Sequence, residues 1–162
     1  MLYFVISLAL VLFDQASKYY MSNILPLCQH GSCQSIEILP ILKFTLLHNK
    51  GAAFSFLSDA GGWQRYLLVS ISSVVSLFIA AWLYRIYKQE KILALALSFI
   101  LGGAIGNLID RAIQGYVVDF VVVYYDPYYF PAFNVADSAI TIGAFLLILD
   151  MFYKPGSVKV VE

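Results

Sequence analysis

Two carboxylates in apolar surroundings are the residues of this sequence that best fit catalysis. Asp119 lies in the run VVDFV at 117–121, and Asp137 lies in NVAD at 134–137, just before a long apolar stretch. Neither has a basic residue at helical spacing, so a local ion pair does not account for them. Two carboxyl groups held close together cannot both ionise, so one keeps a proton while the other can take one from water. Such a pair can hydrolyse a peptide bond without a nucleophilic side chain.

Other hydrolytic chemistries lack parts in this sequence. It contains no Gly-x-Ser-x-Gly elbow and no His-Glu-x-x-His pair, and neither His30 nor His48 has the neighbours of a serine triad. Cys28, Cys33 and His30 lack a fourth zinc ligand at suitable spacing, and the two cysteines fit a disulfide as well as two free thiols. The inventory therefore favours an aspartyl hydrolase, with no metal and no cofactor.

A second set of polar residues lies in or beside apolar stretches. Ionisable groups there cost roughly 2.5–3.5 kcal/mol each, so each needs a partner or a function. Asp14 and Lys18 are four residues apart and predict an ion pair along one helix. Asp110 and Arg111 are adjacent and cannot face each other on a helix, so we expect them to bond neighbouring helices or substrate. The nearby glycines indicate close helix packing: Gly102, Gly103 and Gly106.

The composition predicts the environment that must position these residues. Of the 162 residues, 61% are apolar and 12% are charged, and the mean hydropathy is +0.80. Ordinary globular chains are roughly 45–50% apolar and about 25% charged. These values exclude a soluble enzyme and a disordered chain, and the balance of 10 Lys and Arg against 10 Asp and Glu excludes a nucleic-acid partner. The sequence is that of a membrane protein.

Four stretches are long and apolar enough to cross a bilayer as helices, which takes about 20 residues each. We expect no further domain, so the chain from 1 to 162 is predicted to be one integral membrane unit. The fold class is an all-α membrane protein with four transmembrane helices and a small β-sheet at the outer surface. The expected spans are about 2–21, 64–85, 92–111 and 133–153.

The positions of Lys and Arg predict the orientation. The connection 85–91 has three cations, and the tail after the fourth span has Lys154 and Lys159, so both should be cytoplasmic. Both termini are then inside, and the segments 22–63 and 112–132 face the periplasm. The acids and cations singled out above lie at the outer ends of the spans, or in the outer segment 112–132 in the case of Asp119, so all of them converge on one depth at the outer membrane surface.

The two outer segments contain short stretches rich in β-formers. Strands are predicted at 35–39, 41–48 and 116–125, with a turn at 49–51, and together they form a small sheet on the membrane surface. The aromatic residues between 124 and 133 should lie at headgroup depth, where amphipathic rings are favoured.

Five motif blocks, in order along essentially the whole chain, resemble those of the bacterial lipoprotein signal peptidases (signal peptidase II). One block would be weak evidence, but five at sensible spacing on four spans are specific. They are DQASK at 14–18, NKGAAF at 49–54, GGAIGNLIDR at 102–111, VVDF at 117–120 and FNVADS at 133–138.

The resemblance implies an intramembrane aspartyl endopeptidase of the bacterial inner membrane that cuts diacylglyceryl-modified prolipoproteins just before the lipidated cysteine. It maps the catalytic dyad onto Asp119 and Asp137. It also implies a mobile periplasmic helix near 54–63 and supporting roles for Asp14, Lys18 and Asp110. The residues that would bind or position substrate are Asn49, Gly51, Asn107, Arg111 and Asn134.

Two other classes compete with this interpretation. A small transporter or proton channel also uses intramembrane carboxylates, but it needs a polar path across the bilayer, and the second and third stretches offer Ser and Gly toward their inner halves. A non-catalytic scaffold would explain the glycines and leave the acids unexplained. The partners expected are the lipidated substrate and membrane lipid, and we expect a monomer.

Overall fold

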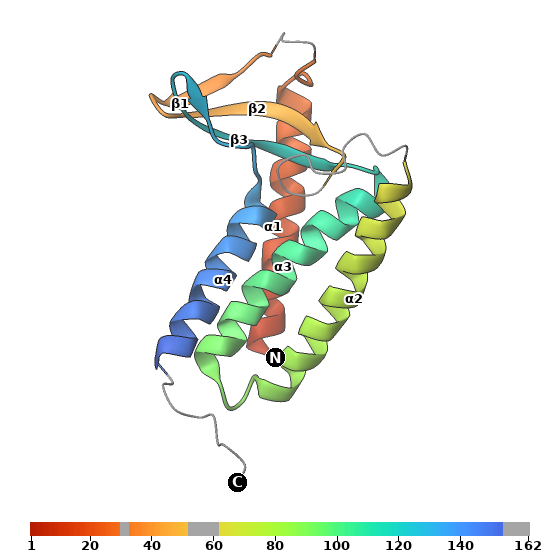
Figure 1. Ribbon diagram of the computed structural model, residues 1–162, viewed down its shortest axis with the longest axis vertical. Helices are drawn as coiled ribbons and strands as arrows, with labels where there is room; N and C mark the ends of the chain where they lie inside the picture. The colour runs from red at the N-terminus through yellow and green to blue at the C-terminus, as the bar shows by residue number, and fades with distance from the viewer. Residues whose placement is uncertain (30–32, 52–61, 154–162) are drawn as a thin grey trace.

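The computed structural model is an elongated helical bundle with a small sheet at one end (Figure 1). The structure describes residues 1–29, 33–51 and 62–153. In chain order its elements are α1 (Leu2–Ile24), β1 (Ile36–Leu39), β2 (Leu42–Asn49), α2 (Trp63–Ile86), α3 (Lys91–Ile113), β3 (Val117–Tyr125), β4 (Tyr128–Tyr129) and α4 (Val135–Tyr153).

Within the described residues, four helices are long and apolar enough to cross a membrane, as predicted. The observed helices differ from the predicted spans by at most a few residues. Helix α1 continues past the apolar stretch to Ile24, because a helix can extend into polar surroundings once it is formed. Helix α4 begins at Val135 instead of Phe133, because Asn134 caps its first turn.

Helix α3 lies at the centre of the bundle and packs against α1, α2 and α4. Its glycines allow this close approach. A Cβ added at Gly103 would collide with the carbonyl oxygen of Ala136 in α4, and one added at Gly106 would lie 2.6 Å from Oδ2 of Asp14 in α1. The close-packing role predicted for these glycines is therefore confirmed.

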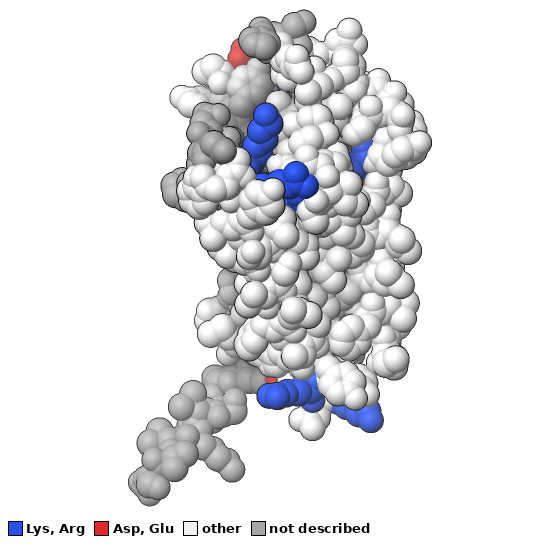
Figure 2. Space-filling view, turned by 90° about the vertical axis from the view of Figure 1, so that its right-hand side faces the viewer, with Lys and Arg blue, Asp and Glu red and all other residues white. Residues whose placement is uncertain are grey.

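The outward faces of the helices are strongly apolar. On α2, for example, Val74 and Leu77 are 67% and 72% exposed. On the face shown in Figure 2, Lys and Arg side chains lie toward the two ends, and an uncharged band separates them. Such a band fits the hydrocarbon core of a bilayer.

The sheet is antiparallel, with the strand order β1-β2-β3-β4. The three predicted strands are confirmed, whereas the two-residue strand β4 was not predicted. The predicted turn at 49–51 needs a correction at its first residue. Asn49 ends β2, because its pairing opposite Val117 of β3 extends the strand by one residue, and the chain bends at Gly51.

A disulfide joins Cys28 and Cys33 and thereby decides between the two alternatives left open by the sequence. The loop carrying it is attached to β2, since the backbone N–H of Cys28 donates to the carbonyl of Leu46 at 2.9 Å. The paired sulfurs are no longer available as zinc ligands. His30 lies outside the described residues.

The two ends of the bundle differ in what they carry. The N-terminus, the connection between α2 and α3 and the end of α4 lie at one end, and the sheet lies at the other (Figure 1). Within the described residues, the connection 85–91, expected to be cytoplasmic, and the strands, expected to be periplasmic, thus lie at opposite ends.

Candidate active site

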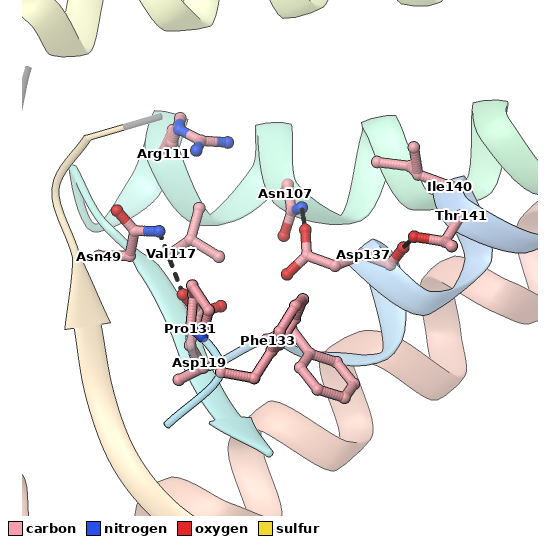
Figure 3. Close-up of a pocket in the computed structure, with 12 residues that line it drawn as sticks. Asn49, Asn107, Arg111, Val117, Asp119, Pro131, Phe133, Asp137, Ile140 and Thr141 are labelled. Atoms are coloured by element: carbon pink, nitrogen blue, oxygen red, sulfur yellow. Dashed lines mark hydrogen bonds between the residues drawn. The ribbon is translucent and has the colours of Figure 1, made fainter. Parts of the chain in front are cut away.

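A cavity of about 250 Å³ opens where the sheet meets the helices (Figure 3). Its walls combine a few polar side chains with apolar ones, and both acids singled out in the sequence contribute to it. The lining residues come from β2, α3, β3, α4 and the segment before α4: Asn49, Asn107, Arg111, Val117, Asp119, Phe130, Pro131, Ala132, Phe133, Asp137, Ile140 and Thr141.

Asn134 connects the two acids. Its side-chain Nδ2 donates to Oδ1 of Asp119 at 2.7 Å. Its Oδ1 accepts the backbone N–H of Asp137 at 2.9 Å, and its own N–H donates to Oδ2 of Asp137 at 3.2 Å. The last two bonds form a reciprocal capping box at the start of α4. The local signal that begins the helix therefore also sets the position of Asp137 relative to Asp119.

Asn107 in α3 holds the other oxygen of Asp137. Its Nδ2 donates to Oδ1 of Asp137 at 2.8 Å. Its Oδ1 accepts from Nδ2 of Asn134 at 3.3 Å and from Nζ of Lys18 at 3.0 Å. These acceptor bonds fix the amide so that its NH₂ group points at Asp137.

The second oxygen of Asp119 is held from β2. Asn49 Nδ2 donates to Oδ2 of Asp119 at 3.1 Å, while Oδ1 of Asn49 accepts the N–H of Gly51 at 3.0 Å. The carbonyl of Gly51 in turn accepts from Nη2 of Arg111 at 3.0 Å. The Nε of Arg111 is buried and has no hydrogen-bond partner among the described residues, so this guanidinium retains donor capacity beside the cavity.

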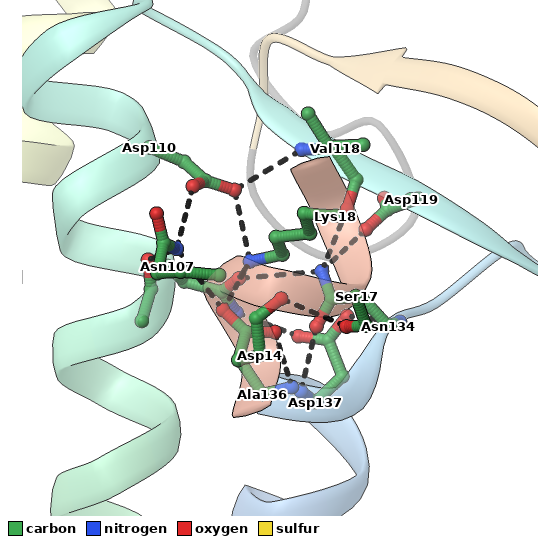
Figure 4. Close-up of polar contacts among 12 residues, drawn as sticks. Asp14, Ser17, Lys18, Asn107, Asp110, Val118, Asp119, Asn134, Ala136 and Asp137 are labelled. Atoms are coloured by element: carbon green, nitrogen blue, oxygen red, sulfur yellow. Dashed lines mark hydrogen bonds and ion pairs between the residues drawn. The ribbon is translucent and has the colours of Figure 1, made fainter. Parts of the chain in front are cut away.

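A buried ion cluster lies behind the acids (Figure 4). Nζ of Lys18 is 2.8 Å from Oδ2 of Asp14, which confirms the predicted pair along α1, and it is also 2.8 Å from Oδ2 of Asp110 in α3. Both carboxylates also accept backbone N–H groups: Asp14 from Ala136 at 2.9 Å and Asp110 from Val118 at 3.2 Å. The costly burial of these charges is offset by this pairing and by these bonds.

The surroundings of Asp119 favour its protonated form. Burial is the main cause, and the nearby charge of Asp137 adds to it; together they raise the pKa of Asp119 from 3.8 to about 7 despite the bonds from Asn49 and Asn134. A carboxyl group that keeps its proton near neutral pH, beside a second carboxylate, is the arrangement required for general acid and base catalysis.

The structure brings all ten site residues predicted from the sequence into one hydrogen-bonded network. Five line the cavity: Asn49, Asn107, Arg111, Asp119 and Asp137. Gly51 and Asn134 bond to that group, and Asp14, Lys18 and Asp110 form the ion cluster behind it. The predicted helix near 54–63 lies outside the described residues, apart from Gly62 and Trp63, and Trp63 begins α2.

Sequence reasoning missed other members of the site. Gln15 Nε2 donates to Asp110 at 2.9 Å and to Asp14 at 3.2 Å, and the available signal was a polar amide inside an apolar stretch. The cavity walls at 130–133 and 140–141 gave no such signal, because apolar residues there fit a membrane interface equally well. Among the described residues, no group of three His, Cys, Asp or Glu could hold a metal ion.

Comparison with known proteins gives consistent similarities. Residues 6–153 match the family model described as signal peptidase (SPase) II. The chain is 49% identical over 148 residues to the lipoprotein signal peptidase of Acinetobacter baumannii, covering 91% of this chain and 81% of that protein. It is 50% identical over 153 residues to the lipoprotein signal peptidase of Alteromonas mediterranea, covering 94% and 80%.

The fold also matches solved structures. One is described as a bacterial membrane enzyme determined by the in meso method at 2.3 Å; it has a TM-score of 0.75 at 30% identity and covers 99% of this chain and 93% of that one. A second, at 1.9 Å, has a TM-score of 0.71 at 30% identity, with coverages of 95% and 94%.

Proposed function

The chain belongs to the signal peptidase II family, and on that premise we propose that it is an intramembrane aspartyl endopeptidase acting on lipidated prolipoproteins. In this proposal it removes the signal peptide by cutting on the N-terminal side of the diacylglyceryl-modified cysteine. The relatives compared above are named lipoprotein signal peptidases, which supports a prolipoprotein as substrate.

The observation that carries the aspartyl mechanism is that Asp119 and Asp137 line one cavity and are bridged by Asn134. Asp137 accepts two N–H bonds, which suit a carboxylate, whereas burial favours the protonated form of Asp119. We assign the shared proton of the resting enzyme to Asp119.

The reaction follows from these protonation states. The Asp137 carboxylate takes a proton from a water molecule as the water oxygen bonds to the scissile carbonyl carbon, and Asp119 gives its proton to the carbonyl oxygen. The tetrahedral intermediate then collapses. Asp137 returns its proton to the departing amide nitrogen, the C–N bond breaks, and Asp119 recovers a proton from the intermediate's hydroxyl. Both acids end as they began.

The polar residues around the dyad are proposed to hold the substrate backbone near the acids. Arg111 lines the cavity and has donor capacity left at Nε, so it suits a substrate carbonyl or a lipid phosphate. Asn49, Gly51, Asn107 and Asn134 are proposed to position the substrate, the dyad or both. Asp14, Lys18 and Asp110 support the site from behind.

The depth of the cavity suits a substrate anchored by acyl chains. The cavity lies where the sheet meets the outer ends of the apolar helices, so a lipidated peptide could enter sideways with its chains in the bilayer and its scissile bond at headgroup depth. We propose that this end faces the periplasm of a bacterial inner membrane, that both termini are cytoplasmic, and that the protein acts as a monomer with 1–162 as one unit.

The test is cleavage of a lipidated precursor by the purified protein in detergent, with the products identified by mass spectrometry. The expected product begins at the lipidated cysteine. A matched precursor with the cysteine left unlipidated should be cut far more slowly. No cleavage of the lipidated precursor, or cleavage at another bond, would refute the proposal.

A further inference from the structure

Arg65, in the first turn of α2, contacts the end of a different helix. Its Nε donates to the carbonyl of Arg111 at 3.0 Å, and its Nη2 donates to the carbonyls of Ala112 at 2.6 Å and Ile113 at 3.4 Å. These carbonyls belong to the last turn of α3, where intrahelical acceptors run out of donors. The carbonyl of Arg111 also accepts the backbone N–H of Gly115 at 3.2 Å. One guanidinium from α2 therefore caps the end of α3.

The chain beyond α3 is built closely around this guanidinium. Gly115 has a positive φ of 82°, and a Cβ added there would lie 3.2 Å from Cδ and 3.3 Å from Nη1 of Arg65. Two residues later β3 begins, and β3 carries Asp119. Arg65 thus contacts the joint between the helix that presents Arg111 and the strand that presents one of the acids.

The same joint also carries Arg111. The backbone carbonyl of Arg111 is bonded to Arg65, while its side chain bonds the carbonyl of Gly51 and lines the cavity. Arg65 itself is not among the described residues that line the cavity. The bonds of Arg65 among the described residues lead toward the site through the end of α3.

We propose that Arg65 is a positioning residue that fixes the end of α3, and through it the direction from which Arg111 reaches the cavity. This inference rests on the proposed function, because it assigns Arg111 a role with substrate. The guanidinium of Arg65 suits this role because its N–H donors are held in one plane. Nε and Nη2 reach successive carbonyls at once, which a single ammonium cannot reproduce, and the positive charge is favourable at a helix C-terminus.

The experiment is a double-mutant cycle on the purified, full-length protein in detergent. Arg65→Gln should lower kcat/KM for a lipidated precursor by about tenfold. This loss should divide between KM and kcat in the same proportion as the loss caused by Arg111→Lys. In the Arg111→Lys background, Arg65→Gln should cost less than about threefold, because the group it positions is already altered. Arg85→Gln, at the other end of α2, is the matched control and should behave as wild type.

If the fold-losses in kcat/KM of the two single variants multiply in the double variant, Arg65 does not act through Arg111, and the inference is overturned. So would an Arg65→Gln protein with wild-type kcat/KM, even if it were less stable. If Arg65→Gln does not accumulate, Arg65→Lys replaces it in the cycle, since it keeps the charge and loses the fork.

Hydrogen–deuterium exchange over residues 107–119 tests the joint without any substrate. Exchange should be faster in Arg65→Gln than in wild type and unchanged in Arg85→Gln. Unchanged exchange in Arg65→Gln would overturn the inference whether or not the wild type cuts the precursor. A wild type that cuts nothing would instead refute the proposed function.

Discussion

Asp14 and Asp110 hold the two proposed catalytic acids in the same way, each by bonding the residue just before one of them. Asp14 accepts the backbone N–H of Ala136, which precedes Asp137, and Asp110 accepts that of Val118, which precedes Asp119. Both carboxylates are also 2.8 Å from Lys18. The ion cluster therefore connects α1 and α3 to the backbone that carries each acid.

Replacing Lys18 by Met should destabilise the protein strongly. The change leaves Asp14 and Asp110 buried without their cation, and removing one partner of such a cluster costs about 3–5 kcal/mol. Thermal unfolding in detergent should show a clearly lower midpoint, and the folded fraction should cut more slowly. Lys88→Met, on the exposed connection between α2 and α3, is the control. Equal midpoints for the two variants would contradict the role assigned to the cluster.

Asn134→Ser separates helix capping from the contact with the dyad. Serine is also a good N-cap, so α4 should still form. The variant also loses the bonds that Nδ2 donates to Asn107 and to the carbonyl of Val118, so the unfolding midpoint should fall moderately. The donor to Asp119 is lost, and with it the bridge between the acids. We expect kcat to fall by about tenfold or more in steady-state cleavage. Normal turnover would mean that the bridge by Asn134 is not needed.

The spans were predictable because length and hydropathy alone determine which helices can satisfy their backbone in lipid. The acids were predictable for a related reason: a carboxylate in an apolar run is too costly to be accidental. The second partner of Lys18 was not predictable, because Asp110 meets it only after α1 and α3 have packed. The bridge by Asn134 depends likewise on where β3 lies relative to α4.

The role proposed for Arg65 could not be predicted from the sequence. In the sequence Arg65 is a single cation at the start of the second predicted span, about 64–85. Its three bonds to the end of α3 exist only in the folded bundle. Sequence patterns thus identify residues that are costly where they lie, but not residues whose role depends on a distant contact.

Cleavage should weaken as pH rises through about 7. In the proposed mechanism Asp119 donates its proton. Burial together with the charge of Asp137 raises the pKa of Asp119 to about 7, so the active form of the free enzyme should be lost above that value. The check is kcat/KM for a lipidated precursor between pH 5 and pH 9. A rate that keeps rising across the alkaline half of this range would assign the proton to another group.

The same raised pKa makes a prediction about stability. Between pH 3.8 and a pH of about 7 the folded protein holds a proton on Asp119 that the unfolded chain has released. The free energy of unfolding therefore contains a contribution from Asp119 that is present at low pH and is lost as the pH rises through about 7. The unfolding midpoint of wild type relative to Asp119→Asn should therefore decrease over this range. A difference that increases would contradict the assignment.

Topology can be tested with reporters fused along the chain. Fusions after Lys88 or at the C-terminus should read cytoplasmic, and a fusion near Asp59 should read periplasmic, because cations concentrate in 85–91 and in the tail. The sheet and the cavity lie at the end of the bundle opposite the connection containing Lys88. A periplasmic reading at Lys88 would put the acids on the cytoplasmic side and contradict the proposed function.

The most direct test of the dyad is turnover of a purified lipidated precursor by Asp119→Asn, Asp137→Asn and the double variant. Asparagine keeps the size of aspartate and can still hydrogen-bond, but it cannot take a proton from water, so each single variant should fold and insert normally and lose cleavage. The double variant should be no worse than either single one, because the two acids act as one unit. Substantial turnover by either single variant would contradict the shared-proton mechanism and return that residue to a structural role.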